Sequence, residues 1–176
     1  MLSKHVLAIL VENKPGVLAR VAGLFGRRGF NIDSIAVGET AEPAISRMTI
    51  VVKADEKTLE QIVKQLNKLI NVLKIGIIKS EGSVARELVM IKVRTTPENR
   101  QEILQIAASF RAKVVDVSLD SLIVEATGDS EKVKALQGLL AHFGILEMVR
   151  TGKISILRGS RTTKNGETKH NDEADA

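Results

Sequence analysis

The stretch ENKPGVL, residues 12–18, decides how the first part of the chain folds. It ends an apolar run, turns on Pro15-Gly16 and opens a segment whose apolar residues recur at helical spacing. Residues 5–11 are the predicted strand. The predicted helix has one apolar face, made of Val17, Leu18, Val21, Ala22, Leu24 and Phe25. Pro15 suits the first helical turn, since the hydrogen-bond donor that it lacks has no partner there.

The start of this helix is a candidate ligand site. The backbone N–H groups of Gly16, Val17 and Leu18 come before the first helical hydrogen bond and so have no acceptor inside the helix. Such groups lie at the positive end of the helix dipole and suit a small anion. We interpret the turn as a sensing site for a ligand with a carboxylate.

The predicted elements of the first half follow the order β-α-β-β-α-β. Two extended segments, 31–40 and 45–53, are joined by a polar turn that contains Pro43. Asp55 is the predicted N-cap of a second helix, and residues 72–79 are the fourth strand. The second helix buries an apolar face made of Leu59, Ile62, Val63, Leu66 and Leu69.

The same order of elements repeats in the second half. The predicted features are a strand at 88–94, a helix opened by Thr96-Pro97-Glu98, a hairpin of 114–118 and 122–126, a helix from Asp129 to Gly144 and a last strand at 145–157. The two helices bury Ile103, Leu104, Ala107 and Phe110, and Val133, Leu136, Leu139, Leu140 and Phe143. The fold class is therefore α+β, with two ferredoxin-like βαββαβ units, each an antiparallel sheet with both helices on one face.

Composition divides the chain into three parts. We expect the first unit at residues 4–80 and the second at 86–158, with the joint at 80–86, which contains Gly82 and Ser83. Residues 159–176 are polar and contain no apolar side chain larger than Ala, so we expect a disordered tail.

The first sheet is expected to be covered on both faces. Both faces of residues 6–11 are apolar, and so are those of 50–52, whereas a half-solvated antiparallel strand would alternate. We expect another copy of the fold to cover the face or edge without helices, which predicts a homodimer built from the first units. The alternative is that the two units of one chain cover each other.

The first helix contains glycines at a spacing of three. Gly29 is expected to end the helix. Gly23 and Gly26 lie inside it, where each costs about 1 kcal/mol relative to Ala. We expect them to allow close packing against a neighbouring helix; the alternative is a role at a ligand.

Composition excludes several function classes. The chain has no Cys, which excludes thiol chemistry and disulfides, and its net charge of +5 comes from 26 basic and 21 acidic residues without a dense basic block. Four Phe, no Tyr and no Trp argue against base stacking, so no nucleic-acid partner is expected. No signal peptide or membrane span is recognisable, and we expect a cytoplasmic protein without a membrane partner. The three His, at 5, 142 and 170, lack the spacing of a metal site, and His142 is expected to be structural at a helix end.

Five motifs together carry a resemblance to a known family. They are residues 12–18, GFNIDS at 29–34, SRMTI at 46–50, REL at 86–88 and RTG at 150–152. With them, residues 4–158 resemble the regulatory small subunit of acetolactate synthase, also called acetohydroxyacid synthase, with the first unit as an ACT domain. Phe30 stands where many members have Tyr.

The resemblance implies a non-catalytic subunit. Such a subunit binds the catalytic large subunit, raises its activity and imposes feedback inhibition by a branched-chain amino acid, typically valine. Thiamine diphosphate, FAD and magnesium are then expected on the partner and no cofactor on this chain. The alternative is a free-standing ACT-type sensor that regulates a different enzyme.

The effector site that the resemblance implies consists of Asn13, Pro15, Gly16, Val17, Leu18, Asn31 and Ile32. The valine carboxylate would bind the N–H groups of Gly16 and Val17, and its ammonium group would bind the side chains of Asn13 and Asn31, one of them from a partner chain. Ile32 would line the apolar slot. The alternatives are a plain turn residue for Asn13 and a left-handed residue after the helix for Asn31.

Overall fold

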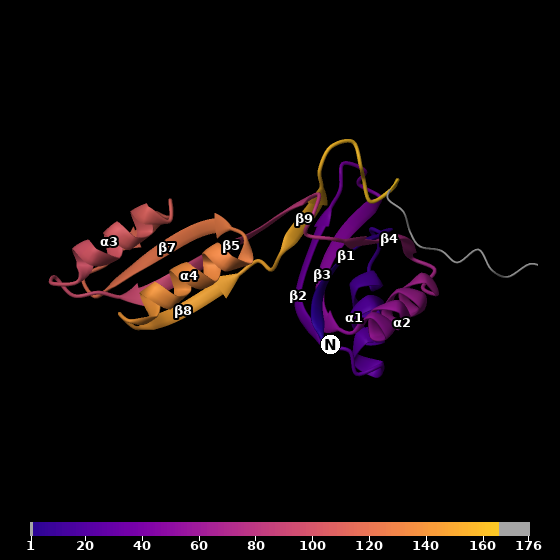
Figure 1. Ribbon diagram of the computed structural model, residues 1–176, viewed down its shortest axis with the longest axis horizontal. Coiled ribbons are helices and arrows are strands. Elements are labelled where there is room, and N and C mark those ends of the chain that lie inside the picture. Colours follow the sequence, from indigo (N-terminus) through magenta and orange to yellow (C-terminus); the bar gives the residue numbers. More distant parts are fainter. Residues whose placement is uncertain (1, 166–176) are drawn as a thin grey trace, which may run out of the picture. The chain divides into compact units, whose positions relative to one another are not determined.

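The computed structural model describes residues 2–165 of the 176-residue chain, which divide into two compact units (Figure 1). One unit contains the chain up to Val84 and also residues from Ser155 on; the other is Ala85–Ile154. The second unit is therefore inserted into the first, because residues from Ser155 on pack with the first sheet; the expected limit of the second unit at residue 158 stays a prediction.

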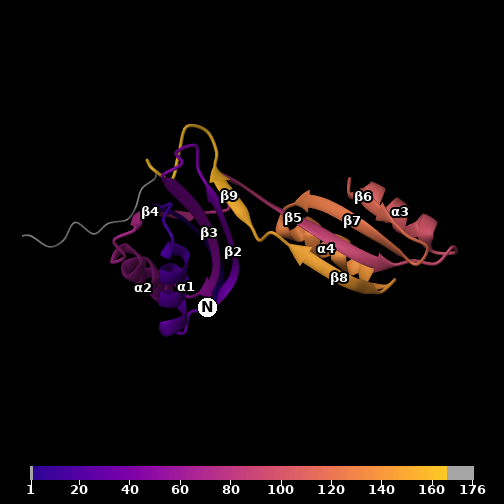
Figure 2. The same ribbon diagram turned by 180° about the vertical axis from the view of Figure 1, so that it is seen from behind.

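The first unit has the predicted βαββαβ order. Its elements are β1 (Ser3–Glu12), α1 (Val17–Arg27), β2 (Ile32–Glu39), β3 (Ile45–Ala54), α2 (Glu56–Asn67) and β4 (Val72–Ile78). The four strands form an antiparallel sheet in the order β2-β3-β1-β4, and both helices cover one face of it (Figure 2). Asp55 caps α2 as predicted, since its carboxylate accepts the N–H of Thr58 at 2.8 Å.

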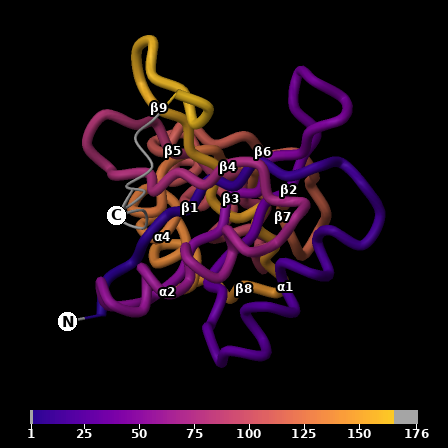
Figure 3. The backbone as a smooth tube through the Cα atoms, turned by 90° about the vertical axis from the view of Figure 1, so that its right-hand side faces the viewer, coloured from indigo at the N-terminus to yellow at the C-terminus, as the bar shows by residue number. Residues whose placement is uncertain are grey.

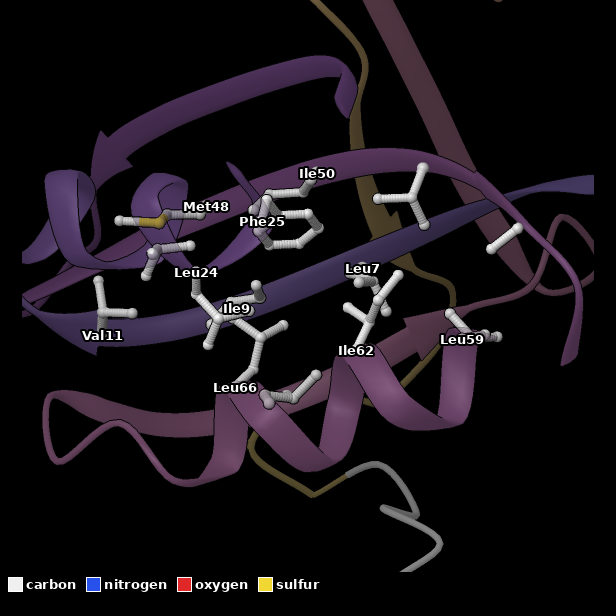
Figure 4. Packing of buried hydrophobic residues seen from close by; sticks show 14 of the residues in the cluster. Leu7, Ile9, Val11, Leu24, Phe25, Met48, Ile50, Leu59, Ile62 and Leu66 are labelled. Atoms are coloured by element: carbon white, nitrogen blue, oxygen red, sulfur yellow. The ribbon is translucent and has the colours of Figure 1, made fainter. Parts of the chain in front are cut away.

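The core of the first unit lies between the sheet and its two helices. Side chains from β1 and β3 meet those of α1 and α2 there, as Figure 4 shows for Leu7, Ile9, Val11, Leu24, Phe25, Met48, Ile50, Leu59, Ile62 and Leu66. All of these are at most 6 % exposed. The alternate residues of the strands point to the face without helices.

The face without helices is covered by the same chain. Residues 155–165, here called the C-terminal segment, cross it: Arg47 of β3 donates to the Ser155 carbonyl at 2.6 Å and to the Thr163 hydroxyl at 2.8 Å. Apolar residues of this face are buried, namely Ala8, Leu10, Val51 and Ile78. The segment can be followed in Figure 3 as the yellow loop after β9. A second copy is therefore not required to bury this face, contrary to our expectation.

The C-terminal segment also corrects the predicted tail. Residues 159–165, expected to be disordered, include Thr163, which is only 5 % exposed. Arg47 supplies the hydrogen bond that composition alone did not reveal. Residues 166–176 of the predicted tail lie outside the described residues.

The second unit repeats the order of elements. It contains β5 (Ser83–Arg94), α3 (Arg100–Ser109), β6 (Lys113–Val117), β7 (Ser121–Gly128), α4 (Ser130–Ala141) and β8 (Ile145–Arg150). The sheet order is β6-β7-β5-β8, and β9 (Ile154–Leu157) pairs with β5 outside this path. The α+β class with two ferredoxin-like units is confirmed.

Three predictions in the second unit need correction. The expected last strand is broken, because Gly152 has a φ of 84° between β8 and β9. The helix begins at Arg100 rather than at Pro97, since residues 97–99 form a turn in which Asn99 Oδ1 accepts the Thr96 N–H at 2.7 Å. Leu139 is 44 % exposed and does not join the core.

The REL and RTG motifs meet in this unit. The Glu87 carboxylate, 2 % exposed, is bound by the Arg150 guanidinium through Nη2 at 2.6 Å and Nε at 3.1 Å. The Thr151 hydroxyl accepts the Leu88 N–H at 3.1 Å. The two motifs thus join the start of β5 to the end of β8.

Candidate effector site

The turn between β1 and α1 leaves backbone donors free. Gly16 is the N-cap of α1 in a left-handed conformation, with φ 83°, and no side chain caps the helix. Within residues 2–165, the N–H groups of Gly16 and Leu18 have no acceptor, whereas that of Val17 reaches the Lys14 carbonyl at 3.4 Å. Pro15 lies in the turn and not in the first helical turn as predicted, because the left-handed Gly16 separates it from the helix.

The space above Gly16 is open. A Cβ built on Gly16 would meet no atom within 4 Å, and the residue itself is exposed. The side chain of Leu18, 46 % exposed, lies on the outer side of the same helix start, whereas Val17 is 4 % exposed and belongs to the core. The turn therefore offers the amides of Gly16 and Leu18 and the apolar side chain of Leu18 to solvent.

A network of polar side chains surrounds Glu12, at the start of the turn. The Glu12 carboxylate accepts from Asn71 Nδ2 at 2.6 Å and is 3.2 Å from Lys14 Nζ, and these contacts, that of Asn71 first, hold the pKa of Glu12 below its ordinary value. Arg20 Nη1 donates to Asn71 Oδ1 at 2.8 Å. Sequence reasoning missed Asn71 and Arg20, since both lie outside the motif and only the fold brings them to it.

Asn13 joins the turn to the hairpin between β2 and β3. Its backbone N–H donates to the Ala44 carbonyl at 2.8 Å and its Nδ2 to the Pro43 carbonyl at 2.8 Å. Its Nδ2 is also 3.4 Å from Glu39 Oε2, at the end of β2. Among residues 2–165 no group donates a hydrogen bond to its amide oxygen, which is therefore left as an acceptor.

Asn31 and Ile32 lie at the opposite end of the sheet. Ile32 pairs with Val52 at the start of β2, whereas Asn13 lies beside the far end of β2, roughly 24 Å away at about 3.4 Å per residue along the strand. One chain therefore does not bring the predicted site residues together. Ile32 is half-buried against its own core, and Asn31 Nδ2 is 3.3 Å from Asp33 Oδ1.

The structure also bears on the packing expected for the glycines and on the backbone expected for Asn31. The left-handed residue after α1 is Gly29, with φ 68°, and not Asn31. Gly26 is exposed and an added Cβ would meet nothing within 4 Å, while at Gly23 it would meet only the Arg27 side chain at 3.2 Å. No helix within residues 2–165 therefore packs closely against these glycines, contrary to our expectation for a single chain.

The described part of the chain contains no candidate metal centre. No group of three His, Asp or Glu residues that could hold a metal ion occurs in residues 2–165. His142 Nδ1 lies 3.1 Å from the Gly138 carbonyl at the end of α4, as expected for a structural residue. None of the helices within this range is long and apolar enough to cross a membrane.

Comparison with known proteins identifies the family. Residues 7–74 match the model of the AHAS small subunit-like ACT domain, and residues 86–159 match that of the small subunit of acetolactate synthase. A probable acetolactate synthase small subunit from Archaeoglobus fulgidus is 56 % identical over 158 residues, which cover 90 % of this chain and 99 % of that one. The acetolactate synthase small subunit of Mycobacterium leprae is 54 % identical over 160 residues, 91 % of this chain and 95 % of that one.

A solved structure agrees over the same length. The small subunit of acetolactate synthase from Thermotoga maritima superposes with a TM-score of 0.83 at 46 % identity, covering 90 % of this chain and 99 % of that one. The first unit is thus an ACT domain, and the chain belongs to the family of acetolactate synthase small subunits.

Proposed function

We propose that this chain activates the catalytic large subunit of acetolactate synthase and makes it sensitive to feedback inhibition by valine. The observation that carries the proposal is the open start of α1, where the N–H groups of Gly16 and Leu18 have no acceptor within residues 2–165. The chemistry belongs to the partner, which would carry thiamine diphosphate, FAD and magnesium, and both subunits would work in the cytoplasm.

The effector's carboxylate would bind at this helix start. Two free amides at the positive end of α1 can donate charge-assisted hydrogen bonds, each worth about 1.5–3 kcal/mol. The Val17 amide, which we expected to be free, contributes less because it already reaches the Lys14 carbonyl. The ammonium group would bind the free amide oxygen of Asn13.

A homodimer would complete the site. The exposed edge strand β2 carries Val37, which is 45 % exposed. If two β2 edges pair antiparallel, the start of one β2 lies beside the end of the other. Asn31 and Ile32 of one chain then lie next to Glu39 of its partner, which is beside Asn13 of the turn. Two-fold pairing therefore brings together residues that one chain holds apart.

Single variants test the site. Gly16→Asp places a carboxylate where the effector's carboxylate would bind, and Asn31→Ala removes an acceptor. We expect both to abolish valine inhibition of the reconstituted enzyme and to leave activation largely intact. Gly26→Ala, on the exposed side of α1, is the matched control and should be inhibited like the wild type. Unchanged inhibition curves for both site variants would remove the assignment.

Mixing the two variants tests the dimer. A mixed dimer of Gly16→Asp and Asn31→Ala chains contains one site with both defects and one with neither. Co-expression followed by isothermal titration should therefore recover valine binding at one site per mixed dimer. Recovery cannot occur if the site is built within one chain, and a strictly monomeric particle in light scattering would exclude the dimer outright.

A further inference from the structure

The C-terminal segment is bound to the first sheet by one half-buried cation. Arg47 donates through Nη2 to the Ser155 carbonyl at 2.6 Å and through Nη1 to the Thr163 hydroxyl at 2.8 Å. Ser155 and Thr163 are 6 % and 5 % exposed. Thr163 can approach because Gly76 of β4 has no side chain: a Cβ there would lie 3.3 Å from Thr163 Cγ2.

Arg47 depends on these acceptors. No carboxylate among residues 2–165 lies within 4 Å of its guanidinium group, so its two hydrogen bonds run to neutral oxygens. Burial lowers the pKa of Arg47, which shows that the cation has lost part of its hydration. In the structure the segment is bound and protein oxygens satisfy Arg47; on release, water would have to replace these two acceptors.

Strand β3, which carries Arg47, begins next to the hairpin that contacts the candidate effector site. Arg47 lies close to the hairpin that joins β2 to β3, and Asn13 is bound to this hairpin through the carbonyl groups of Pro43 and Ala44, both at 2.8 Å. Glu42 of the hairpin is paired with Lys164 of the C-terminal segment. This ion pair is exposed and contributes little energy, but it shows that the hairpin contacts both the effector turn and the segment.

We propose that the C-terminal segment transmits effector binding at the turn to the second unit, and that Arg47 is the positioning residue that holds the segment. The segment follows Ile154 directly, so its bound and released states constrain the chain at the end of the second unit. An effector that binds Asn13 alters the bonds that hold the hairpin and shifts the segment between the two states, provided its affinity differs between them. This inference rests on the proposed function and specifies how the effector site is coupled to the second unit.

The test variants remove hydrogen bonds between Arg47 and the C-terminal segment and leave the residues of the effector site unchanged. Arg47→Leu removes both donors, and Thr163→Val removes one acceptor while keeping the shape of the side chain. Lys53→Leu is the matched control, since Lys53 is an exposed cation on the same strand and face. Valine binding to each isolated full-length subunit is measured by titration, and inhibition is measured with the reconstituted enzyme.

We expect both variants to bind valine within about twofold of the wild type, while the valine concentration for half inhibition rises at least about fivefold. Lys53→Leu should behave like the wild type. In hydrogen exchange of the wild type, valine should change the protection of residues 155–165, and Arg47→Leu should lose this response. The exchange measurement keeps the test valid if Arg47→Leu weakens the fold.

Two results separate the possible failures. If the wild type binds valine and is inhibited, but the exchange of residues 155–165 does not respond and Thr163→Val is inhibited normally, the coupling is refuted and the effector site stands. If the wild type binds neither valine, leucine nor isoleucine, the proposed function fails, and the coupling fails with it.

Discussion

The ion pair of Glu87 and Arg150 makes the second unit depend strongly on one side chain. Arg150→Ala would leave the Glu87 carboxylate, 2 % exposed, without the guanidinium that binds both of its oxygens. Removing one partner of a buried pair costs about 3–5 kcal/mol. Because Arg150 itself is 35 % exposed, water can enter after its removal, and we expect the lower end, about 3 kcal/mol.

The measurement must report on the second unit. The chain has no Trp and no Tyr, so urea unfolding is followed by far-UV circular dichroism, and hydrogen exchange assigns the loss to Ala85–Ile154. Arg86→Ala is the control: Arg86 is exposed and, among residues 2–165, binds only the carbonyl of its neighbour Ala85, so its removal should cost at most about 0.5 kcal/mol.

A double variant separates the pair's net contribution from the cost of an unpaired charge. Glu87→Leu with Arg150→Met replaces both charged groups by apolar ones and should recover most of the stability lost in Arg150→Ala. A loss below about 1 kcal/mol in Arg150→Ala, or a double variant that is no more stable than the single one, would contradict the reasoning.

Three further predictions concern stability and assembly. Gly26→Ala should raise the free energy of unfolding by about 0.5–1 kcal/mol, since Gly26 is helical, exposed and free of neighbours; a lower urea midpoint would reveal a contact at this position. Hydrogen bonds from Thr58, that of its side chain first, keep the pKa of Asp55 below its ordinary value of 3.8, so the stabilisation is complete above that pH and is lost as the pH falls through the lower folded value. Asp55→Asn should flatten this part of the stability–pH curve, and an unchanged curve between pH 5 and about pH 2 would assign the acid sensitivity to other groups. Val149→Asp should reduce activation of the large subunit without changing valine binding, because it puts a charge on the exposed apolar surface that we expect the large subunit to contact. Val149, 53 % exposed, pairs there with the exposed Met90 on the helix-free face of the second unit. Lys134→Asp on α4 is the control, and equal losses of activation in both variants would point to a charge effect.

The fold could be predicted from the sequence because its signals are local. The Pro-Gly turn, the Asp55 and Asp129 caps and the helical spacing of apolar residues each act within a few residues, and the structure contains the corresponding elements. The predicted helix starts were less accurate. The helix at Arg100 begins later than predicted because Thr96 and Asn99 form a turn, which composition does not distinguish from a helix cap.

Contacts between distant segments were not predictable. The bonds from Arg47 to Ser155 and Thr163 join residues more than 100 positions apart, and nothing in a polar tail indicates which part of it has a partner. The distance between Asn13 and Asn31 likewise depends on strand direction, which a motif does not encode. The membership of the effector site therefore stays a prediction, and the separation of Asn13 from Asn31 agrees with the expectation that one of them comes from a partner chain.

The inserted second unit has a consequence for biosynthesis. Residues 85–154 must be translated before Ser155 and Thr163 become available to cover the first sheet. At roughly 5–20 residues per second this delay lasts between about 4 and 14 s. During that time a nascent ACT domain leaves the ribosome with one apolar surface bare. Premature stop codons just before residue 155 should therefore be more harmful to solubility than the mostly polar composition of residues 155–176 suggests.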